Sequence, residues 1–194
     1  MLTTPTRTAG GYGATVQGAT ISRTSALRGP ISDATFDRVK IQIVVVGKDR
    51  GDPLVEAADA YVERLARYYP ATVTELREEP AKSSTPIERV RAVEAERIQK
   101  ALPKDAYLIA LDETGKELRS TEIAERISRW ALEARPQLSF VIGGPNGLDR
   151  ALLASAKERW ALSRLTLPHR LARLVLAEQL YRAATIIRGE PYHR

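Results

Sequence analysis

The sequence contains no cysteine and has two histidines among its 194 residues. Without thiols the chain can form neither disulfide bonds nor zinc-thiolate sites, and it has no thiol nucleophile. Two imidazoles leave little material for a metal centre, so we expect no bound metal. Any chemistry must therefore come from other side chains or from the backbone.

Long apolar runs are also absent. The longest ones, such as Ile43 to Val46, cover a few residues, whereas a membrane-spanning helix needs roughly 20. Hydrophobic residues nevertheless make up 43% of the chain, enough for one sizeable core. We therefore expect a soluble, cytoplasmic protein without a membrane partner.

The common nucleotide-binding fingerprints are missing as well. No Gly-Lys-Ser/Thr occurs in the chain, and the first apolar run is followed by Gly-Lys-Asp-Arg-Gly at 47–51 rather than by a dinucleotide-binding loop. A nicotinamide or flavin oxidoreductase is therefore the least favoured of the functions considered.

The net charge of +6 is unevenly distributed along the chain. Residues 159–194 contain seven arginines against two glutamates, and residues 1–38 contain four arginines against two aspartates. A basic C-terminal segment suits a polyanion such as RNA, because each neutralised phosphate releases condensed counterions. A solvated arginine face explains the same charges equally well.

The first 38 residues are rich in Thr, Ser, Ala, Gly and Arg and show no sustained apolar period, so we expect them not to fold independently. They resemble an organellar transit peptide in composition but lack a clear amphipathic helix. We favour a start codon assigned upstream of a GTG that encodes Val39. Residues 39–194 then form one domain.

From Val39 onward, strand and helix patterns alternate. The predicted strands are 39–46, 72–76, 107–111, 138–142 and 160–165, and the predicted helices are 53–68, 87–102, 120–134 (capped by Ser120 or Thr121), 149–158 and 169–187. The first strand is apolar on both faces, which favours a parallel sheet. The pattern predicts an α/β fold with helices flanking a mostly parallel sheet.

The loop Ile142-Gly-Gly-Pro-Asn-Gly-Leu148 joins a predicted strand to a predicted helix. Ligands bind at this place in open parallel sheets, and glycines allow the backbone to approach them closely. A tight turn that needs positive φ accounts for the loop equally well. Two other strand ends, 108–115 and 162–170, have comparable positions, and together the three predict a shared pocket.

In order and spacing these loops resemble the cofactor-binding loops of SPOUT methyltransferases. The chain from Val39 to Arg194 also resembles the RlmH family, which methylates N3 of a pseudouridine in 23S ribosomal RNA. The matching motifs are Leu-Asp at 111–112, Ile-Gly-Gly-Pro-x-Gly at 142–147, Leu-Thr-Leu-Pro-His at 165–169, Leu-Ala-Glu-Gln-Leu-Tyr-Arg at 176–182 and Pro-Tyr-His-Arg at 191–194. The segment before Val39 has no counterpart in the family.

The resemblance implies a C-terminal deep trefoil knot that binds S-adenosylmethionine in a bent pose. Leu111 would line the adenosine pocket, and Gly143 and Gly144 would approach the cofactor by backbone. The segment Leu162, Ser163, Arg164, Leu165, Thr166, Leu167 and Pro168 would wrap the adenine. The resemblance also implies ribosomal RNA as substrate and a homodimer, in which the final helix packs at the interface and the tail reaches the partner's substrate site.

Methyl transfer from a sulfonium needs no metal, since positioning and loss of the N3 proton suffice. His169 and His193 are candidate proton acceptors, although His169 could instead cap a helix. Tyr192, His193 and Arg194 form either a frayed tail or a nucleobase clamp with a catalytic role, and we favour the clamp. Arg164 and Arg170 could contact the substrate or pair with carboxylates.

Three further interpretations concern side chains and function. Asp112 and Glu113 either hold a cofactor amine or ribose hydroxyl or form a turn. Trp130 and Trp160 lie on apolar stripes and are expected in the core. A non-catalytic RNA-binding module is the alternative function, but such a module does not require three strand-end loops converging on one pocket.

Overall fold

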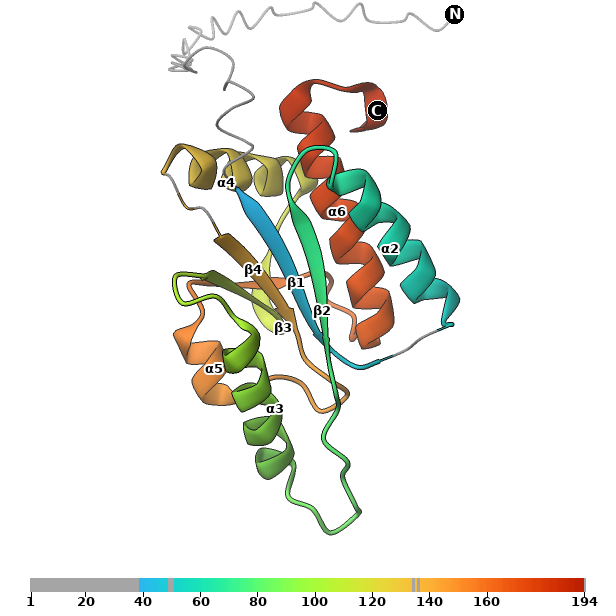
Figure 1. The fold of residues 1–194 in the computed structure, drawn as a ribbon, viewed down its shortest axis with the longest axis vertical. Coiled ribbons are helices and arrows are strands. Elements are labelled where there is room, and N and C mark those ends of the chain that lie inside the picture. The colour runs from blue at the N-terminus through green and yellow to red at the C-terminus, as the bar shows by residue number, and fades with distance from the viewer. Residues whose placement is uncertain (1–38, 49–50, 134, 136, 194) are drawn as a thin grey trace, which may run out of the picture. The chain divides into compact units, whose positions relative to one another are not determined.

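The computed structural model describes residues 39–48, 51–133, 135 and 137–193; the predicted unfolded segment 1–38 and the tail residue Arg194 lie outside this part of the chain. Its centre is a sheet in the order β2-β1-β4-β3-β5, in which every pair of neighbours is parallel (Figure 1). The strands are β1 (Lys40–Val46), β2 (Ala71–Leu76), β3 (Tyr107–Glu117), β4 (Gln137–Ile142) and β5 (Glu158–Ala161).

Helices cover both faces of this sheet (Figure 1). They are α2 (Pro53–Leu65), α3 (Ile87–Ala101), α4 (Ser120–Leu132), α5 (Arg150–Ser155) and α6 (His169–Arg188), followed by the short 3-10 helix η1 (Pro191–His193). The predicted α/β fold is confirmed. No helix within the described ranges is both long and apolar enough to cross a membrane.

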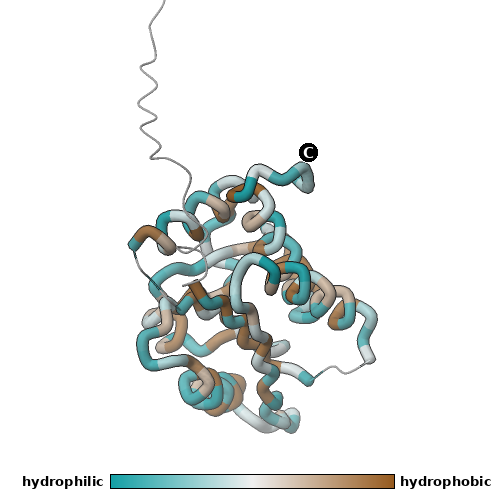
Figure 2. Tube along the Cα trace, turned by 45° about the horizontal axis from the view of Figure 1, so that its top comes forward, coloured by the Kyte–Doolittle hydropathy of each residue, from teal (hydrophilic) through white to brown (hydrophobic). Residues whose placement is uncertain are grey.

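The two faces of β1 explain its continuous apolar run. Ile41 and Ile43 pack into the cluster formed with α2, α4 and α6, whereas Val44 and Val46 pack into a second cluster with α3 and α5. Figure 2 shows hydrophobic residues concentrated along the central strands. Because β1 is buried on both faces, its second half reads as the apolar run Ile43 to Val46, and the buried Gln42 is hydrogen-bonded.

Both tryptophans belong to the core, as expected. Trp130 and Trp160 are each 2% exposed, and their rings stack with centroids 6.0 Å apart. Phe140 packs edge-on against Trp160 at 5.4 Å. These aromatic rings fix the edge strand β5 against α4 and the sheet.

Several predicted boundaries near the edge strand are wrong. The third strand runs six residues beyond the predicted Leu111, because a register shift between Leu111 and Lys116 lets its end pair again with β5. The fifth strand ends at Ala161 instead of residue 165, and the preceding helix ends at Ser155. Residues 112–115 resemble a turn in sequence but form a bulge within the strand, so the continuation of β3 was not predicted.

The predicted cap of α4 is also wrong. Arg119 occupies the cap position, and its backbone N–H donates to Glu122 Oε2 at 2.8 Å. Ser120 lies inside the first turn, and its hydroxyl donates to Gln179 Oε1 of α6 at 2.6 Å. A side chain with a tertiary partner does not cap its own helix.

Candidate active site

The carboxyl ends of β3, β4 and β5 meet at one pocket of about 810 Å³. Its walls are residues 111–114 within the bulge of β3, the loops after β4 and β5, and side chains of α3, α5 and the start of α6. This volume lies within the range of roughly 300–1,000 Å³ typical of small-molecule sites. The three loops singled out in the sequence therefore converge.

The loop after β4 is both a tight turn and a wall of the pocket. Gly147 has φ +78°, and its N–H donates to the carbonyl of Gly144 at 2.9 Å. A Cβ atom on Gly143 would lie 2.9 Å from the carbonyl carbon of Gly147, closer than packing allows. The tight turn is confirmed, and glycine is needed at 143 to close it. The loop also lines the pocket, and its contact with a ligand stays a prediction.

Helix α3 supports this loop from the side of Gly144. Arg91 Nε donates to the carbonyl of Asn146 at 2.6 Å. Glu94 is 3% exposed, accepts from the N–H of Glu79 at 3.0 Å, and would lie 3.4 Å from a Cβ atom on Gly144. Burial raises the pKa of Glu94 above its ordinary value. Neither residue is predicted as a site residue from the sequence, although Glu94 occupies the apolar stripe between Val90 and Ile98.

The bulged part of β3 contributes an acidic wall. Leu111 lines the pocket, followed by Asp112, whose carboxylate accepts the N–H of Thr114 at 3.0 Å and also its hydroxyl. Glu113 lines the pocket too, and its carboxylate accepts from the hydroxyl of Thr166 at 3.4 Å. Residues 112–115 thus form a bulge within β3 instead of the expected turn, and Asp112 lines the pocket together with Glu113.

The loop after β5 supplies most of the remaining wall, which consists of Leu162, Ser163, Leu165, Thr166, Leu167 and Pro168. The Ser163 hydroxyl accepts the N–H of Leu165 at 2.9 Å and shapes the loop. The side chain of Leu165 is left 74% exposed at the pocket. Arg164 does not line the pocket, because its guanidinium pairs with Glu117 at 3.1 Å and is 89% exposed.

Two predicted residues at the start of α6 differ in placement. His169 lines the pocket as the first residue of the helix, and the cap position belongs to Pro168, so His169 is not the cap. Arg170 does not line the pocket, and it pairs with Asp52 at 3.0 Å. Asp52 also caps α2 by accepting the N–H of Leu54 at 2.8 Å. The Arg170 guanidinium thus ties α6 to the start of α2.

The tail folds back on α6. The Tyr192 hydroxyl donates to Glu178 at 3.1 Å, and the Tyr192 ring packs edge-on against Tyr181 with centroids 4.8 Å apart. The guanidinium of Arg182 lies over the Tyr192 ring, 4.7 Å from its centroid. Burial raises the pKa of Tyr192. The described tail is therefore packed rather than frayed.

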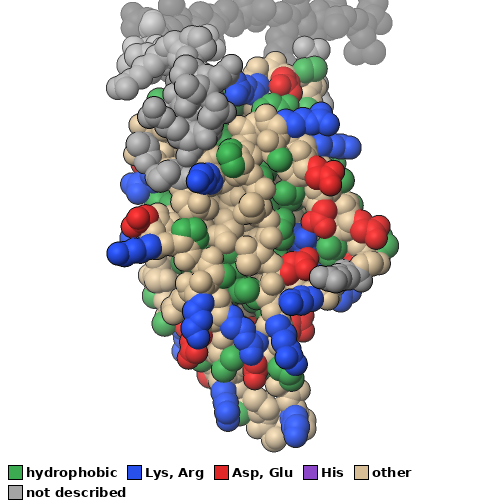
Figure 3. Space-filling view, in the orientation of Figure 1, with side chains coloured by type: hydrophobic (Ala, Val, Ile, Leu, Met, Phe, Trp, Pro, Cys, Tyr) green, Lys and Arg blue, Asp and Glu red, His purple; other side chains and the backbone are tan. Residues whose placement is uncertain are grey.

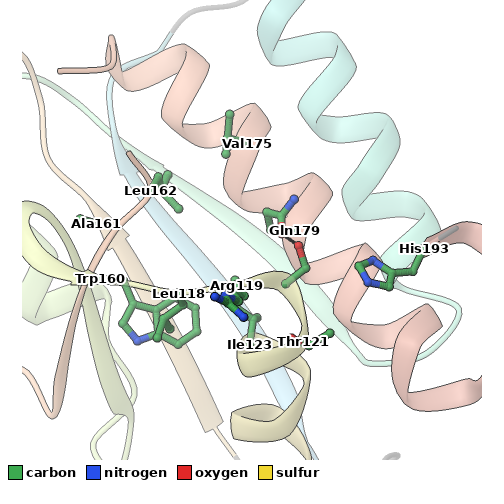
Figure 4. A pocket seen from close by; sticks show the side chains of 11 residues that line it. Leu118, Arg119, Thr121, Ile123, Trp160, Ala161, Leu162, Val175, Gln179 and His193 are labelled. Carbon is green, nitrogen blue, oxygen red and sulfur yellow. Dashed lines mark hydrogen bonds between the residues drawn. The ribbon is translucent and has the colours of Figure 1, made fainter. Parts of the chain in front are cut away.

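His193 lines a neighbouring hollow of about 550 Å³ instead of the strand-end pocket. Figure 4 shows this hollow between the start of α4, the end of β5 and α6, with His193 on the side away from Leu162. Trp160 and Leu162 line both spaces, so the two adjoin. Of the described tail residues, His193 borders the neighbouring hollow, and neither Tyr192 nor His193 lines the strand-end pocket.

No group of three or more His, Asp or Glu side chains suited to holding a metal occurs among the residues whose structure is described. The strand-end pocket offers apolar side chains, backbone groups, two carboxylates and the basic residues Arg91, Arg150 and His169. Such a lining suits an organic ligand that carries both positive and negative groups.

An open parallel sheet with a ligand-sized pocket at its strand carboxyl ends is the arrangement in which α/β domains bind small molecules. Residues 39–193 match a family described as predicted SPOUT methyltransferase, and the chain belongs to that family. The protein is accordingly a methyltransferase.

Curated relatives share this assignment. The "Ribosomal RNA large subunit methyltransferase H" of Anaeromyxobacter sp. (strain Fw109-5) is 46% identical over 156 residues, which cover 80% of this chain and 100% of the relative. The protein of the same name from Listeria monocytogenes serovar 1/2a is 43% identical over 159 residues, with the same coverage of both chains.

Proposed function

We propose that this protein transfers a methyl group from S-adenosylmethionine to N3 of a pseudouridine in large-subunit ribosomal RNA, acting in the cytoplasm on ribosomes. One observation carries the proposal: the three predicted cofactor loops form a single pocket of about 810 Å³ in a member of the SPOUT family. The names of the relatives support the choice of ribosomal RNA.

The pocket fits the chemistry of this cofactor. Leu111, Leu162 and Leu167 offer apolar contact for an adenine ring, and the backbone at 143–144 can approach closely. The carboxylates of Asp112 and Glu113 suit a ligand with an ammonium and a sulfonium charge. When bound, the cofactor supplies an electrophilic methyl group.

The residues of the chain then have to position the base and accept its proton. His169 is the favoured proton acceptor, because its imidazole lines the pocket. His193 and Arg194, with Tyr192, form the proposed clamp on the nucleobase. Arg164 and Arg170 stand outside the pocket, so their proposed contacts with RNA must occur at its rim and in competition with Glu117 and Asp52.

The proposed active form is a homodimer. His193 borders a hollow separate from the strand-end pocket of its own chain, so a clamp role at the substrate is best served by the pocket of a second copy. Mixing a variant that lacks residues 192–194 with Leu165→Arg tests this, since a mixed dimer then has one intact composite site. Restored methyl transfer supports the dimer, and two inactive proteins that remain inactive together contradict it.

The proposed knot belongs to the same segment. The end of β3 pairs with β5 at Lys116 and Trp160. Residues 162–168 then line the pocket together with the bulge of β3 and the loop after β4, and α6 packs against α2. This route supports a threaded C-terminus. A crystal structure traced through residues 105–190 tests it, because an unthreaded path would rule the knot out.

Calorimetric titration with S-adenosylmethionine tests the function. The wild type should bind, and Leu165→Arg should bind far more weakly, because a cation added beside the pocket repels the sulfonium while the exposed position tolerates the change. A folded wild type that binds no cofactor would favour the non-catalytic RNA-binding module instead.

A further inference from the structure

A separate hollow of about 520 Å³ lies beside the edge strand β5 and helix α5. Three basic side chains line it, namely Arg150, Lys157 and Arg159, and all three are exposed. The remaining lining is small or apolar apart from Glu158. We call this space the β5 hollow.

Within the described part of the chain, the three cations of the β5 hollow form no ion pair and no side-chain hydrogen bond. The carboxylate of Glu158 is already engaged, since it accepts from Arg126 Nε at 3.0 Å and from Trp160 Nε1 at 2.8 Å. Like charges gathered without a counter-charge repel one another and create a positive potential. The hollow is therefore suited to an anion.

The β5 hollow adjoins the strand-end pocket. Arg150 and Leu153 line both spaces, and Arg91 adds another cation to the pocket wall. Figure 3 shows Lys and Arg side chains gathered over the part of this face that carries α3 and α5, whereas acidic side chains gather over α2. Arg150 thus links the cations of the pocket wall with those of the β5 hollow.

We propose that the β5 hollow binds backbone phosphates of the RNA strand next to the nucleotide held in the strand-end pocket. This inference rests on the proposed function, because a nucleotide bound in the pocket places the phosphates that flank it within reach of the shared residue Arg150. Arginine guanidinium groups bind phosphate oxygens in a bidentate manner, and lysine binds them as a point charge.

Salt-dependent binding of a labelled single-stranded RNA oligonucleotide to the full chain tests the proposal by fluorescence anisotropy. The variant Lys157→Glu with Arg159→Glu leaves Arg150 intact, since Arg150 also lines the strand-end pocket. The matched control, Lys40→Glu with Arg67→Glu, makes the same charge change at two exposed positions near the amino ends of β1 and β2, where Ile41 N–H donates to Pro70.

The β5 variant should bind RNA at least about tenfold more weakly at low salt, and the slope of log K against log salt should fall by about 1.4, since each single-strand phosphate contributes about 0.7. The control variant should stay within about twofold of the wild type. Equal affinities and slopes for the two variants would overturn the proposal. The proposal would also be overturned if a polyglutamate peptide displaced the labelled RNA as well as an unlabelled RNA of equal charge does. That result would indicate an acidic protein as the partner.

Two readouts separate this inference from the proposed function. Calorimetry with S-adenosylmethionine should give the same affinity for the wild type and both variants. If the β5 variant methylates large ribosomal subunits with an unchanged KM, the phosphate site is wrong and the methyltransferase function stands. If the wild type binds RNA through the hollow but neither binds cofactor nor transfers methyl, the proposed function fails and the phosphate site stands.

Discussion

At the scale of single residues, Leu165 shows how the pocket differs from the rest of the surface. Its side chain is 74% exposed although it lines the pocket, whereas the other leucines of this wall are partly buried. An exposed apolar side chain at a pocket gains free energy when a ligand covers it.

Truncation of this leucine should therefore weaken binding without weakening the fold. We expect Leu165→Ala to lower the affinity for S-adenosylmethionine about tenfold, from the loss of apolar contact worth about 0.8 kcal/mol per methylene. The melting temperature should remain unchanged. Leu132→Ala, at a leucine 54% exposed at the end of α4, should change neither quantity. Equal calorimetric affinities for the two variants would remove Leu165 from the cofactor site.

Glu94 should make stability depend on pH. Burial raises the pKa of this carboxyl, so the folded state prefers its neutral form. The contribution of the neutral Glu94 carboxyl to the free energy of unfolding is therefore fully present below the ordinary carboxyl pKa. It is lost as the pH rises through the raised pKa of the folded state. Glutamine stays neutral, so Glu94→Gln should gain melting temperature relative to the wild type from pH 4 to pH 8.

Thermal unfolding across this pH range measures the effect. Glu96→Gln, on the exposed side of the same helix, provides the control and should follow the wild type at every pH. A difference between Glu94→Gln and the wild type that does not change with pH would contradict the assignment of a raised pKa.

At the scale of elements, the crossing of β3 and β5 determines the shape of the site. The register shift between Leu111 and Lys116 leaves residues 112–115 free to form the acidic wall, and the strand then pairs with β5 again. A Cβ atom at Gly115 would lie 2.5 Å from the carbonyl carbon of Trp160. Glycine is therefore required where these two backbones touch.

Gly115→Ala should lower the free energy of unfolding by about 3 kcal/mol, because the backbones of β3 and β5 must separate to admit the methyl group. Urea denaturation followed by circular dichroism measures this change. Lys116→Ala, at the exposed neighbouring position, should cost well under 1 kcal/mol. If Gly115→Ala lowered the free energy of unfolding no more than Lys116→Ala, the backbones of β3 and β5 would not be in close contact at Gly115.

Helix α6 is fixed by one buried cation. Arg173 is 4% exposed and donates to Asp59 of α2 at 2.6 Å and to Glu75 of β2 at 2.7 Å. Arg173→Ala should destabilise the protein by about 3 kcal/mol, since it leaves two carboxylates facing each other without their counter-ion. Arg67→Ala, an exposed arginine at the end of α2, is the control for denaturation. If both variants lowered the free energy of unfolding by similar amounts, the ion pairs of Arg173 would not be what fixes α6.

Sequence patterns were sufficient for the helices and strands of the interior and for the three loops. The apolar run of β1 and the glycines at 143–147 carry local signals that need no tertiary information. Arg91 and Glu94 could not be predicted, because α3 reaches the loop after β4 only through packing on the sheet. Arg164 and Arg170 likewise find carboxylate partners more than 40 residues away.

At the scale of the whole molecule, residues 158–168 connect three spaces. They line the strand-end pocket, the β5 hollow and the hollow that contains His193. A substrate strand, a cofactor and a second copy of the chain could each contact this segment. Binding at the three spaces should therefore be coupled.

Transfer of a labelled methyl group from S-adenosylmethionine to large ribosomal subunits is the most direct test. Wild-type protein should label RNA at N3 of one pseudouridine, identified by nuclease digestion and mass spectrometry, whereas Leu165→Arg should leave the same RNA unlabelled. Wild-type protein that binds the cofactor but transfers no label to large-subunit RNA would contradict the account.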